Sequence, residues 1–357
     1  MGGKAMRHIF FVCSFGSVYH RVLPLIEEKK SEGDVLVVVS NDKLYKFFKS
    51  YTTFDTVCLK VNSNLITKKD WYKAILNAIK SKIEYGKVFK KVKNDNVYFF
   101  GTGDAIVMFS YIQKLSNENR IFFYPNIENK WDSIVMPSIV ENWKTKIICK
   151  AIKMLLGINV KVRKDCGLYR LCVYKTFFEQ NKIQEVYKAF DTSIYKKYMK
   201  NIPIIENSKI LVLISDLVSE GRVDRKTFEN QMDELINVLD LTYPNQYVIK
   251  AHPNMHKLYG KMVNAPSVEP FIPSQFLMYH PWEFIIADCS AALVSPGHQG
   301  LLNTKLVEII DILKFKDCKV QREMKEFLIS WNPNLLFPQS FGELIGLLKN
   351  DKGKEVS

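Results

Sequence analysis

The sequence predicts an α/β protein built from two Rossmann-like domains that face each other across a cleft. Short runs of apolar residues alternate with segments of helical periodicity in both halves of the chain. Such runs are typical of parallel strands whose sheet is covered by helices on both faces. The chain has 357 residues, which is too long for one ordinary core and suits two domains. We expect the domains to span residues 1–200 and 205–357.

The N-terminal half begins with a strand, a loop and a helix, and this alternation continues along the domain. The predicted strands are residues 9–12, 35–39, 56–59, 97–100 and 121–124, and the predicted helices lie near 22–26, 69–88 and 104–116. From about 137 to 200 the sequence becomes aromatic, basic and mostly helical, which predicts a connector. Lysines alternate with apolar residues over 144–156, a pattern typical of a core helix with a solvated lysine stripe or of a helix that docks on an anionic membrane.

The C-terminal half resumes the alternation at residue 209. Its predicted strands are 209–214, 246–250 and 284–287, and its predicted helices lie near 225–239, 254–261, 301–315 and 341–349, with a further segment near 273–280. Polar residues follow each of these three strands. Loop N–H groups and helix N-termini at the carboxyl ends of parallel strands favour anions, so a phosphorylated ligand is expected there.

Composition limits the class of partner. The net charge of +14 favours an anionic one: a nucleotide-activated substrate, a membrane surface or nucleic acid. The charge is diffuse and no nucleic-acid-binding signature is present, so nucleic acid is not expected. The seven cysteines are scattered and form no C-x-x-C pair, which indicates reduced thiols and no metal site. No signal peptide or membrane-spanning run is evident, and a cytoplasmic protein is expected.

The loop after the first C-terminal strand offers a carboxylate. Glu220 precedes Gly221, and a carboxylate placed there can remove the proton of an acceptor hydroxyl as a general base. Asp216 in the same loop is the rival base. Alternatively, Glu220 serves only to open the following helix.

The next two strands end in groups suited to an anion. Lys250 and His252 are delivered into a turn that Pro253 rigidifies, where they are placed to stabilise negative charge on a departing phosphate. After the strand 284–287, the hydroxyl of Ser290 and nearby N–H groups suit phosphate oxygens. The alternatives are an exposed Lys–His pair and a serine that caps a helix.

These residues resemble the bacterial sialyltransferases and polysialyltransferases of the GT-B type, which use CMP-activated sialic acid. That family shares an acidic-acidic-Gly motif, a Lys-x-His-Pro motif and a Ser-Ser/Thr motif. They match, in the same order, Ser219-Glu220-Gly221, Lys250-Ala251-His252-Pro253 and Cys289-Ser290. The resemblance covers mainly residues 205–300. Three residues depart from it: Ser219 replaces an acid, Cys289 replaces a serine, and Gln275 stands where the family has a ribose-binding glutamate.

The resemblance implies a GT-B architecture with a donor-binding C-terminal domain and an acceptor-side N-terminal domain. It implies inverting, metal-independent transfer of sialic acid or a related acid to a glycan hydroxyl, without a further cofactor. Glu220 would be the base, and His252, Lys250 and Ser290 would stabilise the CMP leaving group. Further donor-side candidates are Pro253, Gln275, Cys289 and His298, with Glu283 as a substitute ribose ligand.

Residues after two N-terminal strands would face the cleft from the acceptor side. These candidates are Gly16, Ser17, His20 and Asp104. Tight turns at strand ends are the other interpretation of these positions.

Three other functions are consistent with part of these sequence features. A Kdo or other CMP-keto-sugar transferase would share the motifs. A UDP- or ADP-sugar transferase would share the fold, although the late acidic pair of such enzymes is matched here only by Glu308 and Asp311 without the usual spacing. A non-catalytic module that binds membrane or glycan through its lysines would need neither Glu220 nor His252.

Overall fold

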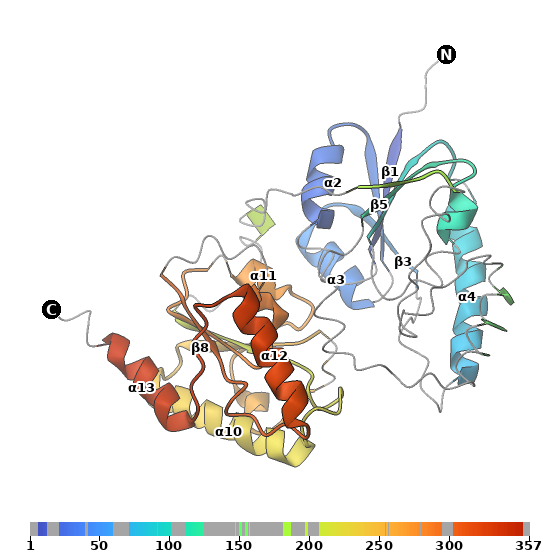
Figure 1. Ribbon diagram of the computed structural model, residues 1–357. Coiled ribbons are helices and arrows are strands. Elements are labelled where there is room, and N and C mark those ends of the chain that lie inside the picture. Colours follow the sequence, from blue (N-terminus) through green and yellow to red (C-terminus); the bar gives the residue numbers. More distant parts are fainter. Residues whose placement is uncertain are drawn as a thin grey trace. The chain divides into compact units, whose positions relative to one another are not determined.

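The computed structural model describes most of the predicted elements. The described residues are 6–12, 21–39, 42–59, 71–90, 92–100, 111–124, 147, 150–151, 154–155, 157, 181–186, 197–198, 207–253, 255, 257–278, 280–294 and 303–352. Contacts divide the chain into two compact units, Met1–Ile194 and Tyr195–Ser357 (Figure 1).

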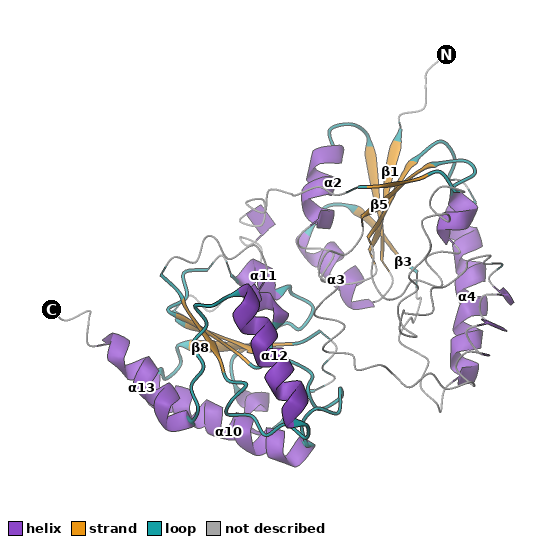
Figure 2. Cartoon of the chain, in the orientation of Figure 1, coloured by secondary structure: helices purple, strands orange, loops and turns teal. Residues whose placement is uncertain are grey.

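The N-terminal unit contains a six-stranded sheet in which every pairing is parallel (Figure 2). Its strands are β1 (Arg7–Val12), β2 (Asp34–Val39), β3 (Asp55–Cys58), β4 (Asn96–Phe100), β5 (Arg120–Tyr124) and β6 (Ile183–Glu185). They lie in the order β3-β2-β1-β4-β5-β6. This is the strand order of a doubly wound nucleotide-binding fold.

Helices cover both faces of this sheet, with α2 (Leu23–Lys29) and α3 (Asp42–Tyr51) on one side and α4 (Trp71–Phe89) on the other (Figure 1). Side chains alternate across β1, so Phe11 joins the core beneath α4, where its ring stacks on Phe99 and Phe89. On the other face, Phe10 stacks on Tyr98, so aromatic side chains of the central strands β1 and β4 pack on both sides of the sheet.

The C-terminal unit repeats the same design with five parallel strands. They are β7 (Ile210–Ile214), β8 (Tyr247–Ala251), β9 (Ser267–Val268), β10 (Phe284–Ala287) and β11 (Lys305–Glu308), in the order β11-β10-β7-β8-β9. The helical elements are α10 (Arg225–Thr242), η3 (Gly260–Asn264), α11 (Ser274–Leu277), η4 (Ala291–Val294), α12 (Cys318–Trp331) and α13 (Phe341–Lys352). All residues of β7, β8 and β10 are buried. The predicted fold class, two Rossmann-like α/β domains, is confirmed.

Two helix predictions in this unit are wrong. In place of the short helix expected near 254–261, the described residues up to Tyr259 are not helical, and the 3₁₀ helix η3 begins only at Gly260. The helix expected over 301–315 does not form, because Lys305–Glu308 is a strand that pairs with β10. The helix α12 was not predicted, although Asp317 caps it by accepting hydrogen bonds from the N–H groups of Lys319 and Val320. Most of the predicted connector over 137–200 lies outside the described residues. Among the helices that the structure describes, none has the length and apolar character needed to cross a membrane.

Candidate active site

The three motifs predicted to bind a donor follow three neighbouring strands. In the C-terminal sheet the chain runs from β7 outward to β8 and β9, and then returns to the other side of β7 as β10. Ligands of open α/β sheets bind at the carboxyl ends of the strands where this reversal occurs. The loops that carry Glu220, His252 and Ser290 follow β7, β8 and β10, so the parallel sheet brings them to one edge.

Glu220 lies in the loop between β7 and α10. Its side chain is 38% exposed, and its Oε2 lies 3.6 Å from Nε of Arg222, whose side chain is buried. Partial burial raises the pKa of Glu220, the charge of Arg222 opposes that rise, and nearby Asp216 adds to it. A carboxylate with a raised pKa is a stronger base than an exposed one, as general-base catalysis requires.

The rival base, Asp216, is less accessible. Its side chain is buried, and its Oδ1 has no hydrogen-bond partner among the described residues. Its carbonyl oxygen accepts a hydrogen bond of 3.1 Å from the N–H of Glu220, which begins the tight turn. Gly221 follows at a φ of 73°, a left-handed conformation that glycine adopts without strain. Of the two carboxylates, Glu220 is therefore the more exposed.

A strained turn follows β10. Cys289 has a φ of 68°, which is uncommon for a residue with a Cβ. Its N–H donates to Oε1 of Glu308 at 2.6 Å, and Glu308 is fully buried at the end of β11. Left-handed residues outside glycine cluster at functional sites, because surrounding structure must hold them in place. The carboxyl of Glu308 supplies that support.

A second buried carboxyl joins β10 to β7. Oδ1 of Asp288 accepts a hydrogen bond of 2.5 Å from the N–H of Ser215, directly after β7. Asp288 is fully buried, and its Oδ2 has no hydrogen-bond partner within the described part of the chain. Asp288 and Glu308 thus connect the carboxyl ends of three adjacent strands, β7, β10 and β11, beneath the turn that presents Ser290.

The buried groups of this turn, Asp288, Cys289 and Glu308, have shifted pKa values. Burial raises the pKa of both Asp288 and Glu308 well above the usual range of carboxyl groups. Burial likewise raises the pKa of the Cys289 thiol, and the charges of Glu308, Asp288 and Glu220 add to that effect, while Arg222 opposes it. Glu220 interacts electrostatically with both Asp288 and Cys289, so the two loops lie within reach of each other. Clusters of groups with perturbed pKa values are typical of functional sites.

His252 lies directly after β8, where the strand gives way to a turn. Its N–H donates to the carbonyl of Ile214 at 2.7 Å, and its carbonyl accepts from the N–H of Met255 at 2.9 Å. The residue is exposed, and Pro253 follows within the turn. The backbone of His252 is therefore hydrogen-bonded to the end of β7, and the residue is exposed to solvent at the carboxyl edge of the sheet.

Lys250 is not placed as the sequence suggested. It is 3% exposed, and its ammonium donates to the carbonyl oxygens of Ala251 and of Pro270, the latter at 2.9 Å. The reason is its position within β8, an inner strand flanked by β7 and β9, rather than beyond the strand end. Lys250 therefore secures the chain after β9, and a role in contacting phosphate does not fit this burial.

Two further residues predicted to bind the donor, Ser290 and Gln275, lie in different elements. Ser290 is half-buried, and its Oγ accepts from the N–H of Ala292 at 3.3 Å, which is the capping arrangement named as the alternative. Gln275 lies in the short helix α11, directly after Pro273 and Ser274; its side chain is outside the described set.

Glu283 does not lie where a ribose ligand was predicted. It precedes β10 and therefore lies at the opposite edge of the parallel sheet. There it accepts from the hydroxyl of Tyr243 at 2.9 Å and pairs with Lys209 at 2.5 Å. It is not available as a ribose ligand at the carboxyl edge. The remaining candidates, Gly16, Ser17, His20, Asp104 and His298, lie outside the described residues.

Three residues of the site were not assigned a role from the sequence: Arg222, Asp288 and Glu308. The sequence suggests Glu308 only as part of a late acidic pair with Asp311, but Asp311 pairs with Lys325 at 2.5 Å. A signal was present for Asp288, since an acid that directly follows a fully apolar strand is positioned at the sheet edge. No comparable signal marks Glu308, because the sequence of its segment predicts a helix.

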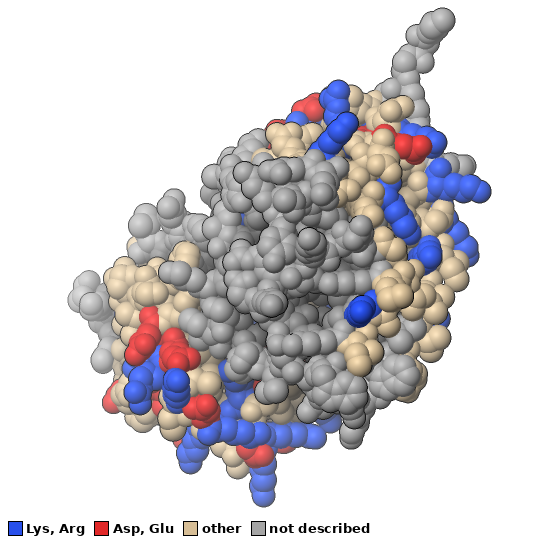
Figure 3. Space-filling model, turned by 45° about the vertical axis from the view of Figure 1, so that its right-hand side comes forward, with Lys and Arg blue, Asp and Glu red and all other residues tan. Residues whose placement is uncertain are grey.

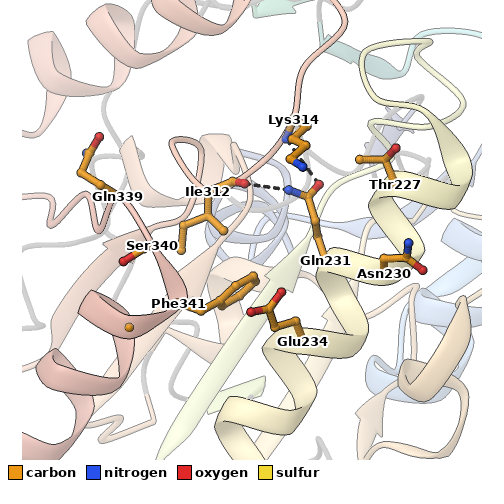
Figure 4. A pocket seen from close by; sticks show the side chains of 10 residues that line it. Thr227, Asn230, Gln231, Glu234, Ile312, Lys314, Gln339, Ser340 and Phe341 are labelled. Carbon is orange, nitrogen blue, oxygen red and sulfur yellow. Dashed lines mark hydrogen bonds between the residues drawn. The ribbon is translucent and has the colours of Figure 1, made fainter.

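A separate cavity of about 540 Å³ opens in the same unit. It is lined by residues of α10, by the chain after β11 and by the start of α13, and it contains none of the predicted site residues. Gln231 forms its wall by donating to the carbonyl of Ile312 at 2.7 Å and accepting from the N–H of Lys314 at 3.3 Å (Figure 4). These bonds use the amide of Gln231 to hold the chain after β11.

Comparison with known proteins supports the fold. No protein-family model and no curated protein sequence matches the chain. Among solved structures, the glycotransferase of kitacinnamycin is similar over 96% of this chain and 90% of its own, with 8% identity and a TM-score of 0.50. UGT2 of Phytolacca americana, described in complex with UDP-2fluoro-glucose and pterostilbene, is similar over 99% and 92%, with 12% identity and a TM-score of 0.45. The first likeness shows that the chain has a GT-B fold.

Proposed function

We propose that this protein is a glycosyltransferase that moves a sugar from a nucleotide-activated donor to a hydroxyl acceptor. One observation carries the proposal: Glu220, with its raised pKa, lies within electrostatic reach of the strained Asp288–Ser290 turn at the reversal point of the C-terminal sheet. A base beside an anion-binding edge is what such a transfer requires. The GT-B fold is consistent with it.

The roles follow from position and chemistry. Glu220 would take the proton of the acceptor hydroxyl as the acceptor oxygen attacks the anomeric carbon. The bond between that carbon and the phosphate oxygen would break, and its electron pair would remain on the departing nucleotide. His252 and Ser290, which follow the two strands beside β7, would stabilise that charge. Glu308 would act as a positioning residue through its bond to the N–H of Cys289.

For the donor we place a UDP-sugar ahead of a CMP-activated keto sugar. The resemblance to CMP-dependent enzymes rests on motif residues, and three of these depart from the pattern: Ser219, Gln275 and Cys289. The burial of Lys250 removes a fourth expected contact. The order of the motifs along the chain remains the observation that favours CMP-linked sialic acid, Kdo or a related acid.

The test begins with nucleotide binding by the full chain. We would measure thermal shifts with UDP, CMP and ADP, first for the unaltered protein and then for Ser290→Ala. Stabilisation by UDP that weakens in Ser290→Ala supports the proposal with a UDP donor, and the same pattern with CMP supports the keto-sugar alternative. The absence of any nucleotide-dependent shift would overturn the proposed function.

Turnover is then measured as nucleotide release from UDP-sugars and from CMP-sialic acid, with glycan acceptors and with or without EDTA. Glu220→Gln should abolish release while preserving the thermal shift. If Glu220→Gln and His252→Ala leave the protein's function intact while charge reversals in the lysine-rich surface remove it, the non-catalytic interpretation replaces this proposal.

A further inference from the structure

The helix α4 of the N-terminal unit has apolar residues on two faces. One face packs against the sheet through the buried Tyr85 and Phe89. On the other face Leu76, Ile79 and Ile83 are 52%, 38% and 57% exposed. Their spacing of three and four residues places them in one row along the helix. A surface helix ordinarily turns polar residues to solvent, so this row is unusual.

Lysines border this row on both sides. At about 100° per residue, Lys80 and Lys87 project to one side of the Leu76–Ile83 row and Lys82 to the other. All three lysines are exposed. The helix α4, at the right of Figure 1, is turned toward the viewer in Figure 3, where basic side chains lie among uncharged surface. An apolar row between cationic flanks is the design of a helix that lies in a membrane interface.

A second segment extends the surface beside α4. The ammonium of Lys82 donates to the carbonyl oxygen of Leu155 at 3.2 Å, so the two segments are adjacent. Near that contact Met154 is 75% exposed, and Ile147 and Lys150 are exposed as well. These residues belong to the lysine-rich stretch whose sequence pattern suggested membrane docking. The structure therefore joins two basic, apolar segments that are distant in sequence.

We propose that this surface, formed by the Leu76–Ile83 row of α4 with Ile147 and Met154, docks on an anionic lipid bilayer. The apolar side chains would enter the boundary between headgroups and acyl chains, and the lysine stems would extend their ammonium groups to lipid phosphates. A second copy of the chain is a poorer occupant. A symmetric pairing of this face would oppose lysines with lysines in a protein whose net charge is +14.

The experiment is flotation of the full chain with vesicles of phosphatidylcholine alone or mixed with phosphatidylglycerol. We expect binding to the mixed vesicles and little to the neutral ones. Replacing Leu76, Ile79 and Ile83 together by Gln should lower the partition coefficient by about tenfold or more, since apolar burial drives interfacial binding. Replacing Lys80, Lys82 and Lys87 by Gln should lower it by about fivefold per lysine and should remove most of its salt dependence.

The matched control lies on the C-terminal unit. Leu241 and Val263 are exposed to a similar or greater degree, and a Leu241→Gln/Val263→Gln variant should float like the unaltered protein. Circular dichroism melting verifies that each variant is folded. The proposal is overturned if the unaltered chain does not bind mixed vesicles, or if the α4 variant binds them undiminished. Self-association that depends on the α4 row, without vesicle binding, would also overturn it.

Discussion

The carboxyl group of Glu308 accepts a hydrogen bond of 2.6 Å from the backbone N–H of Cys289. This bond joins the carboxyl ends of the neighbouring strands β11 and β10 and holds Cys289 in its left-handed conformation. The next residue, Ser290, is thereby presented at the edge where a donor phosphate is proposed to bind. Support from a buried polar group explains how the turn keeps a strained geometry.

The first prediction concerns the pH dependence of stability. Burial raises the pKa of Glu308 above its value in the unfolded chain, so between these two pKa values the folded state binds a proton that the unfolded chain has released. The stability this provides is full below the unfolded pKa and is lost as pH rises through the folded pKa. Glu308→Gln cannot ionise, so its unfolding midpoint in urea should fall less between pH 5 and pH 9 than that of the unaltered protein.

The matched variant Glu308→Ala removes the acceptor altogether. It leaves the N–H of Cys289 buried without a partner, which should cost about 1–3 kcal/mol at every pH. Equal pH dependence in the unaltered and Gln proteins would show that Glu308 is not protonated in the folded state. Burial also raises the pKa of Asp288, so Asp288 should contribute to the pH dependence of stability in both the unaltered protein and Glu308→Gln.

The second prediction concerns Glu220, the proposed general base. Glu220→Gln keeps the shape of the side chain and removes its proton affinity, so turnover should fall by about 10²–10⁴-fold with little change in nucleotide binding. Because the pKa of Glu220 is raised, the proposed transfer by the unaltered protein should become faster with pH over a higher pH range than an ordinary glutamate would give. Asp216→Asn is the comparison, and a larger loss of turnover there than in Glu220→Gln would assign the base to Asp216.

A third prediction follows from the thiols. Burial raises the pKa of Cys289, whereas Cys318 is exposed at the start of α12. Only the thiolate reacts with alkylating agents. Iodoacetamide at pH 8 should therefore label Cys318 well before Cys289, as read by peptide mass mapping, and in denaturant the two should react alike. Comparable labelling of both in the native protein would contradict the burial of the turn.

The fourth prediction concerns backbone strain at Cys289. A β-branched side chain is strongly disfavoured at a φ of 68°. Cys289→Val should therefore be less stable than Cys289→Ala by about 1–3 kcal/mol, measured by urea unfolding. The alanine variant controls for loss of the thiol, because alanine tolerates the same backbone better. Equal stability of the two would mean that the turn relaxes without difficulty.

Local patterns predicted the strands that carry the candidate site. The runs that became β7 and β10 are apolar on both faces, so their composition was enough to predict strands. The run that became β8 ends in Lys250 and Ala251, and the sequence did not indicate that Lys250 is buried within the strand. The segment 301–315 was misassigned because Lys305–Glu308 is short, and its character as a strand depends on pairing with β10 rather than on its own periodicity.

By itself the sequence determined the alternation of strands and helices, the two α/β domains and the loops that carry Glu220, His252 and Ser290, because these depend on residues close together in the chain. Only the tertiary structure decided which loops are neighbours, that Lys250 is buried inside β8, and that Glu308 supports the turn at Cys289. The order of strands in a sheet fixes those relationships through contacts between distant segments, and no local period encodes that order.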